Sequence, residues 1–274
     1  MFGSLDASNF SGCVPFYDNE FEKILSKITI CYQLMKTDKV VLENDENKIR
    51  DVLVNNYINN PKIKQDLQLN YFFFPEVPES KTSGRTDIRI HNPNSFLNQN
   101  EEYYIIECKR LDNTNTVGTS GLNAKYIENG IDRFITKCYS SYYRVNGMIG
   151  FIVEDLKIDE NVKSINVLLT TSFSSIITKQ EITKDSFIDE FEYHYSSIHT
   201  DEDNDELKIY ESKHECIKSK TEFSGSKETI LACGNGNGSV IFKTENEPPV
   251  SIANVTTDTS GLFKPKVLVT FSTI

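Results

Sequence analysis

The spacing of hydrophobic residues predicts two amphipathic helices in the N-terminal part of the chain. Within residues 16–36, apolar side chains recur three and four positions apart, as on the buried face of a helix: Phe21, Ile24, Leu25 and Ile28. A second helix is expected to begin after Asn44 or Asp45 and to stop at Pro61. Its apolar face carries Ile49, Val52, Leu53 and Tyr57.

Strand-like segments dominate the middle of the chain. Prolines and Gly84 separate three of them, at residues 67–74, 85–90 and 103–111. A polar loop at 112–123 leads to a predicted helix at 125–143 and to predicted buried strands at 147–154 and 165–171. Residues 181–222 are polar and acidic, which favours a helix with surface loops. Short strands are expected in the tail, at 228–234, 239–244 and 266–272.

This order of elements predicts an α/β protein in two parts. Residues 1–222 form the larger domain, in which helices flank a mixed sheet, and residues 223–274 form a β-rich C-terminal segment of unknown role. A "GNGNGS" stretch at 234–239 lacks the Lys-Ser/Thr pair and the following helix of a phosphate-binding loop. We therefore interpret it as a hairpin connection.

Two of the predicted strands have one apolar face and one charged face. Because side chains alternate along a strand, the even-numbered residues share a face: Ile88, Ile90, Tyr104, Ile106 and Cys108. The odd-numbered residues share the other: Asp87, Arg89, Ile105, Glu107 and Lys109. Burying charge is unfavourable by several kcal/mol unless it is compensated, so the charged face needs an explanation. Cys108 lies on the apolar face, which predicts core packing and not a nucleophile.

A hairpin of these two strands would bring two carboxylates together. Symmetric pairing about residue 97 places Asp87 directly opposite Glu107. Opposed carboxylates repel each other, and a hard divalent cation would remove that repulsion. Mg²⁺ is typically held by one or two carboxylates together with waters and phosphate oxygens. Lys109 on the same face could hold a water or stabilise charge on a phosphate oxygen, so the pattern predicts metal-assisted phosphodiester hydrolysis.

The segment "GRTDI", followed by a hydrophobic strand ending in "IIECK", resembles the PD-(D/E)XK nuclease superfamily, also called the restriction-endonuclease-like fold. The resemblance covers roughly residues 40–155. It implies an α-β-β-β-α-β core, in which Asp87 and Glu107 bind Mg²⁺ (or Mn²⁺ as a substitute) and Lys109 assists the attacking water. Thr86 stands where the family name has proline.

The resemblance also implies a supporting carboxylate on the first core helix. Glu46 fits, because it shares a helical stripe with Ile49 and Leu53, and Glu43 is a weaker substitute that precedes the expected cap. Glu46 is either a metal ligand, directly or through water, or simply an acidic first-turn residue that is favoured by the helix dipole.

The helix after the motif carries Asn129, Arg133 and Lys137 at successive four-residue steps. In the family this helix lies near the site, so these three residues are candidates for contacting nucleic-acid phosphates. The alternative is a solvated helix face, which nearby Glu128 and Asp132 support.

The net charge does not exclude a nucleic-acid partner, and the composition argues against a membrane protein and a zinc or disulfide framework. The formal net charge is −11, yet residues 181–215 alone hold twelve Asp/Glu and three Lys. The remaining sequence is therefore nearly neutral and can contain a locally basic groove. No apolar run of about 18 residues and no signal-peptide pattern occurs, which predicts no membrane association and a cytoplasmic protein. Six scattered cysteines indicate neither a zinc site nor a disulfide framework.

These observations predict a Mg²⁺-dependent nuclease, with DNA as the expected partner and with a homodimer possible, as in many relatives. Two alternatives stay open. One is a catalytically inactive module of the same fold that binds nucleic acid or a protein. The other is a phosphoryl-transfer enzyme for small nucleotides, which the missing nucleotide-binding loop disfavours.

Overall fold

The computed structural model describes residues 14–79, 84–97, 102–139, 143–216, 241–242 and 250–251. The chain divides into two units, Met1–Ser219 and Lys220–Ile274, close to the expected boundary after residue 222. In the second unit, β8 (Ile241–Phe242) pairs antiparallel with β9 (Val250–Ser251). β8 falls within the strand expected at 239–244, whereas the other two expected tail strands and the 234–239 loop lie outside the described residues.

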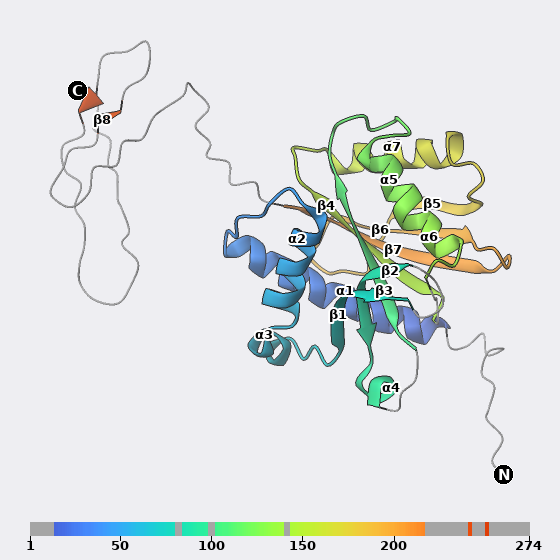
Figure 1. Cartoon of the computed structure of the whole chain (residues 1–274), viewed down its shortest axis with the longest axis horizontal. Coiled ribbons are helices and arrows are strands. Elements are labelled where there is room, and N and C mark those ends of the chain that lie inside the picture. The colour runs from blue at the N-terminus through green and yellow to red at the C-terminus, as the bar shows by residue number, and fades with distance from the viewer. Residues whose placement is uncertain are drawn as a thin grey trace. The chain divides into compact units, whose positions relative to one another are not determined.

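A seven-stranded mixed sheet with the order β1-β2-β3-β4-β7-β6-β5 forms the centre of the first unit (Figure 1). The central strands β3, β4 and β7 are parallel, and the strands on both sides are antiparallel. This arrangement makes the protein α/β with an open mixed sheet, as expected. The strands are β1 (Phe72–Pro78), β2 (Arg85–His91), β3 (Tyr104–Leu111), β4 (Val145–Ile152), β5 (Thr178–Lys184), β6 (His194–Thr200) and β7 (Glu206–Glu215).

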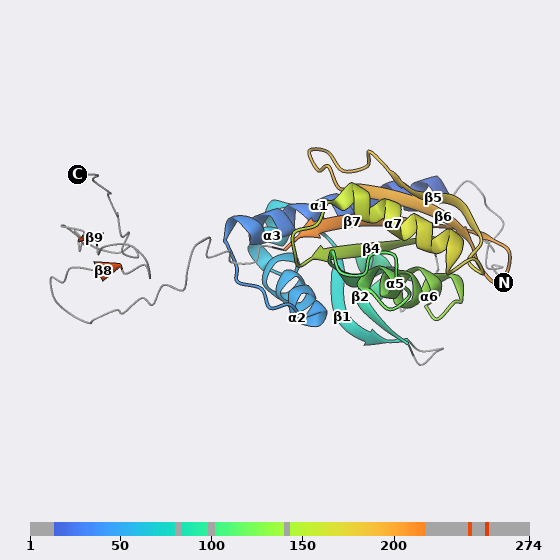
Figure 2. The ribbon, with the colours of Figure 1, turned by 90° about the horizontal axis from the view of Figure 1, so that it is seen from above.

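Helices cover both faces of this sheet (Figure 2). The helix α1 (Val14–Thr37) and the continuous pair α2 (Glu46–Asp51) and η1 (Val52–Ile58) pack on one face. The other face holds α5 (Leu122–Tyr126), η2 (Ile127–Ile131), α6 (Asp132–Ile135) and α7 (Ile158–Thr171). Two further short helices are α3 (Pro61–Asp66) and α4 (Pro93–Leu97). Among the described residues, no helix has the length and apolarity that crossing a membrane requires.

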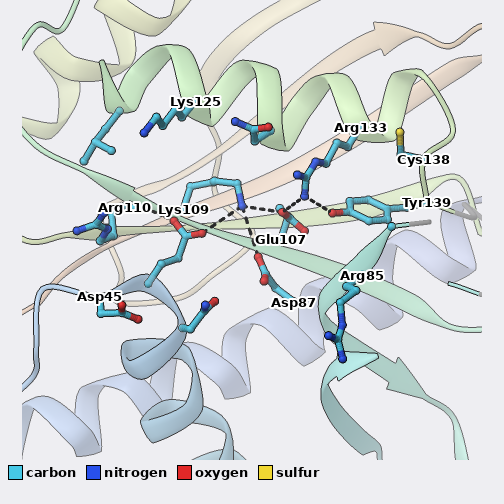
Figure 3. A pocket seen from close by; sticks show the side chains of 15 residues that line it. Asp45, Arg85, Asp87, Glu107, Lys109, Arg110, Lys125, Arg133, Cys138 and Tyr139 are labelled. Atoms are coloured by element: carbon cyan, nitrogen blue, oxygen red, sulfur yellow. Dashed lines mark hydrogen bonds and ion pairs between the residues drawn. The ribbon is translucent and has the colours of Figure 1, made fainter. Parts of the chain in front are cut away.

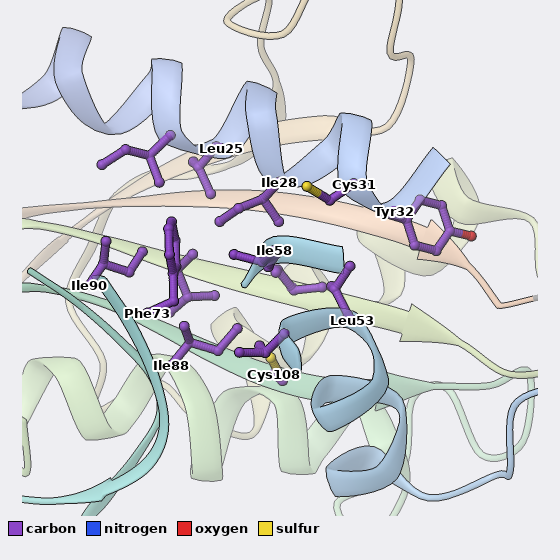
Figure 4. Packing of buried hydrophobic residues seen from close by; sticks show 14 of the residues in the cluster. Leu25, Ile28, Cys31, Tyr32, Leu53, Ile58, Phe73, Ile88, Ile90 and Cys108 are labelled. Carbon is purple, nitrogen blue, oxygen red and sulfur yellow. The ribbon is translucent and has the colours of Figure 1, made fainter. Parts of the chain in front are cut away.

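Strand alternation creates two separate hydrophobic cores, one on each side of the sheet. The even-numbered residues Ile106 and Cys108 of β3 pack with Ile88 of β2 beneath α1 and η1 (Figure 4). The odd-numbered Ile105 joins the opposite core, against the α5–η2–α6 helices. The predicted faces of both strands are therefore confirmed, and Cys108 is fully buried in the core.

Local sequence signals fix the ends of the helices beside β2 and β3. Asp45 caps α2, because its side chain accepts a hydrogen bond from the Lys48 backbone N–H at 3.0 Å. The helical segment ends at Ile58, and Pro61 then opens α3 after the Asn60 cap. Pro61 thus begins a new helix, where the sequence predicted only the end of the previous one.

Several predicted elements are wrong or displaced. Residues 165–171 were expected as a strand but form the end of α7, whose buried positions recur three and four apart. The segment 181–222 contains most of β5 and all of β6 and β7, where a helix with loops was expected. β1 starts at Phe72 and continues through Pro75, so only the end of 67–74 is strand. The helix expected at 125–143 begins earlier, at Leu122, and ends at Ile135.

Close packing between α1 and β4 requires a glycine at position 147. A Cβ placed there would lie 2.8 Å from Cζ of Phe21 and 3.1 Å from Cγ1 of Ile106. We expect Gly147→Ala to destabilise the protein by about 1–3 kcal/mol through overpacking, measured by urea unfolding. Phe21→Leu removes the closest ring atoms, so the double variant should lose less stability than the two single losses added together. An unchanged urea midpoint for Gly147→Ala would contradict this packing.

Candidate active site

The ammonium group of Lys109 lies among three carboxylates that come from three different elements (Figure 3). Its Nζ is 2.6 Å from Glu107 Oε1 on the same strand, 3.5 Å from Asp87 Oδ2 on β2 and 3.4 Å from Glu46 Oε1 on α2. The predicted motif residues Asp87, Glu107 and Lys109 and the predicted supporting residue Glu46 therefore lie together in one cluster. Glu43 instead forms an exposed ion pair with Lys48 outside the site.

The β2–β3 register explains why Asp87 and Glu107 meet. Ile88 pairs with Ile106, so the next position places Asp87 opposite Glu107, and the predicted symmetric register is confirmed. The backbone pairing between β2 and β3 runs from Ile90 to Ile88 and does not include Asp87. Asp87 Oδ2 accepts the Cys108 backbone N–H at 2.8 Å, so its side chain takes the place of a ladder hydrogen bond.

Two of the three carboxylates are anchored by hydrogen bonds from neighbouring groups. Glu46 Oε2 accepts the Arg110 backbone N–H at 2.8 Å, which leaves Oε1 directed at Lys109. Asp87 Oδ1 accepts from Arg50 at 2.9 Å, which leaves Oδ2 directed at Lys109 and at the Cys108 N–H. Anchoring of this kind preorganises a charged site, because the carboxylates need no reorientation to act.

Glu107 is the most deeply buried of these acids, with 1 % of its surface exposed. Its Oε1 accepts from Lys109 and, at 3.3 Å, from Arg133, whereas its buried Oε2 has no hydrogen-bond partner. Burial, followed by the charge of Asp87, raises the pKa of Glu107 to about 7, although Lys109 and Arg133 oppose the rise. An unpartnered buried carboxylate oxygen is costly, so this atom is suited to accept a cation or a water.

Lys109 keeps its positive charge in this environment. Burial lowers its pKa, but the charges of Glu107, Asp87 and Glu46 raise it more, so the pKa lies above the ordinary lysine value. In the metal-free site the group is therefore a cation and a hydrogen-bond donor.

The α5–η2–α6 helices form one wall of a pocket of about 790 Å³ above this cluster (Figure 3). Asn129 and Arg133 line the pocket, as the sequence suggested. Lys137 does not, because the helix ends at Ile135 and Lys137 has a positive φ of 51°. Its Nζ pairs instead with Asp201 and Asp203, so its proposed place on the same helical stripe is wrong.

Sequence reasoning missed several basic residues of the pocket. Lys125 lies one step before Asn129, so the stripe extends toward the helix start and not toward its end. The described part of the lining holds five cationic side chains: Arg85, Lys109, Arg110, Lys125 and Arg133. It holds four carboxylates: Asp45, Glu46, Asp87 and Glu107. The pocket is therefore not acidic, although the chain has a net charge of −11.

The donor set fits a hard divalent ion in chemistry, with Asp87 and Glu107 as its two carboxylates. The unpartnered Glu107 Oε2 supports this fit. Within the described ranges, however, no group of three or more His, Cys, Asp or Glu side chains is arranged to hold a metal. Glu46 contacts Lys109 and the β3 backbone, so it supports the site through these neighbours.

Comparison with known proteins adds no relative: no family model, no curated protein and no solved structure matches the chain. The functional interpretation therefore depends on the residues of this pocket.

The Glu107 carboxyl should titrate near pH 7 in the metal-free protein, because burial and Asp87 disfavour its charged form. Carbon-13 NMR of the glutamate side-chain carboxyls measures this midpoint, and Glu107→Gln assigns the signal. Lys109→Met removes a cation that lowers the pKa, so the midpoint should move higher. A wild-type midpoint near the ordinary value of 4.5 would contradict the burial argument.

Proposed function

We propose that the protein is a metal-dependent nuclease with a restriction-endonuclease-like core, most simply a DNA endonuclease. The observation that carries the proposal is the meeting of Asp87, Glu107 and Glu46 around Lys109 at a pocket with a basic rim. The order of α2–η1, β1, β2, β3, α5–η2–α6 and β4 supports it, because it follows the α-β-β-β-α-β order that the resemblance implies.

Each residue then has a defined role. Asp87 and Glu107 hold Mg²⁺ or Mn²⁺, and the bound ion supplies Lewis-acid stabilisation of charge on the phosphate. Lys109, whose Nζ donates to Glu107 Oε1 at 2.6 Å, is placed to donate a hydrogen bond to the attacking water or to a phosphate oxygen. Glu46 fixes the Lys109 ammonium and the β3 backbone, and so keeps both in place.

The distribution of charge favours a nucleic-acid substrate. Arg85, Lys125 and Arg133 border the carboxylates, and no residue of the acidic 181–215 segment lines the pocket. Lys125 has an exposed side chain and forms no ion pair in the described structure, so it can contact a phosphate without losing a partner. Restriction, defence or repair is the biological setting that the resemblance suggests.

A non-catalytic nucleic-acid-binding module is the second candidate, and one observation favours it. The Lys109 ammonium lies among the three carboxylates, and Arg50 and Arg133 pair with Asp87 and Glu107, so three cations balance three carboxylates without a metal. In such a protein, binding of nucleic acid would be independent of divalent ions and no cleavage would occur.

Cleavage assays separate the two candidates. The purified protein should cut plasmid, linear or single-stranded DNA with Mg²⁺ or Mn²⁺, and EDTA should stop it. Glu107→Gln removes a metal-binding charge, and Lys109→Ala removes the donor, so each should reduce the rate by about 100-fold or more while circular dichroism shows an intact fold. Binding without cleavage in either metal would favour the module, and cleavage by both variants at the wild-type rate would refute the assigned roles.

The corrected position of the basic stripe can be tested by salt dependence. In the Glu107→Gln background, Lys125→Ala should weaken DNA binding and reduce the slope of log K against log [salt] by about 1, because one phosphate contact is lost. Lys137→Ala is the matched control and should leave the slope unchanged. Fluorescence anisotropy with labelled DNA measures both. If Lys125→Ala and Lys137→Ala reduce the slope equally, lining the pocket does not determine which lysine contacts the phosphate, and the assignment to Lys125 is refuted.

A further inference from the structure

Arg50 is a buried cation whose hydrogen bonds are all directed at neighbours of the site. It lies on α2 with 1 % of its surface exposed, four residues after Glu46. A guanidinium has five N–H groups, and five hydrogen bonds of 2.8–3.1 Å are present. Their acceptors are Asp51, Asn47, Asp87 and Glu76. No donor remains for a ligand, so Arg50 acts only through these partners.

Two of the partners are opposed carboxylates on neighbouring strands. Pro75 pairs with Ile88 and Val77 pairs with Thr86, so the register places Glu76 opposite Asp87. Asp87 is in turn opposite Glu107 on β3, as the adjoining ladder shows. Three carboxylates thus follow one another across β1, β2 and β3. Like charges placed in this way destabilise a sheet, and the Arg50 fork bridges the first two of them, at 3.0 and 2.9 Å.

The bridge also decides which Asp87 oxygen faces the pocket. Arg50 occupies Oδ1, so Oδ2 is the atom left beside Lys109 and Glu107. Because Arg50 and Glu46 belong to the same short helix, the same contact joins the helix that carries Glu46 to the strand that carries Asp87. Losing the fork would leave Asp87 held only through Oδ2, by the Cys108 N–H and Lys109, and would leave Glu76 and Asp87 without their shared counter-ion.

We propose that Arg50 is a positioning residue of the metal site: its guanidinium holds Asp87 with a single oxygen presented to the ion. The inference rests on the proposed function, because it assumes that Asp87 and Glu107 bind a divalent cation. Partners that orient a ligand in this way typically change metal affinity by about 10–100-fold when they are removed.

Direct Mn²⁺ binding tests the inference without any measurement of activity. Electron paramagnetic resonance of free Mn²⁺ gives the Kd for the wild-type protein and for Glu107→Gln, which should lose the site. Arg50→Lys keeps a charge but not the fork, so it should weaken binding about 10-fold. Arg50→Met should weaken it by about 100-fold.

Arg89→Met is the matched control. Arg89 lies on β2, the strand of Asp87, and likewise pairs with a carboxylate, the buried Glu79 at 2.9 Å, but it does not line the pocket. Its loss leaves the buried Glu79 without its cation, so thermal unfolding should shift while the Mn²⁺ Kd stays at the wild-type value. Glu76→Gln offers a milder change, because it keeps the Arg50–Asp87 contact and should alter the Kd less than Arg50→Lys does.

The outcomes distinguish the two proposals. If the wild-type protein binds Mn²⁺ and a folded Arg50→Lys variant binds it equally well, the positioning role is refuted and the metal site stands. Equal weakening by Arg89→Met would show a general stability effect, which also refutes the role. If the wild-type protein does not bind Mn²⁺ at all, the proposed metal site fails, and the inference fails with it.

Discussion

The buried ion cluster around Lys109 is the constraint on which the rest of the structure depends. Burying an ammonium and a carboxylate at 7 % and 1 % exposure is favourable only if each finds partners of opposite charge. Glu107 and Lys109 pair within β3, and the other two carboxylates come from α2 and β2, so α2 and the β2–β3 hairpin must assemble before Lys109 has all three partners. The position of the pocket follows from this requirement.

A second Glu-x-Lys sequence shows that the motif alone does not define a site. Glu211 and Lys213 on β7 pair with Met148 and Gly150 of β4, which pair in turn with Glu107 and Lys109 of β3. The two motifs therefore lie in the same register, with the single strand β4 between them. The Tyr126 hydroxyl closes the second motif by donating to Glu211 at 2.7 Å and accepting from Lys213, and both charged residues are fully buried. Because their charges are fully buried and bonded to Tyr126, Glu211 and Lys213 have a structural role.

The errors in the predicted elements have a common physical origin. β6 and β7 are buried on both faces, yet their sequences contain histidines and serines that form hydrogen bonds, such as those of His199 with Ser197 and with Thr178 of β5. Polar residues satisfied inside a core give no hydrophobic alternation to recognise. Conversely, the apolar run 165–171 satisfies a strand pattern locally, whereas its amphipathic helical spacing becomes clear only over the full length of α7.

The sequence by itself determined the two-faced strands β2 and β3 and the register that opposes Asp87 to Glu107, because alternation and hairpin symmetry are local properties. It also indicated Glu46, through the cap at Asp45 and the helical stripe that follows. Only the tertiary structure decided that Arg50 fixes Asp87 and that Lys125, not Lys137, lines the pocket. Those positions depend on how a helix docks and where it ends, and docking is governed by burial across distant segments.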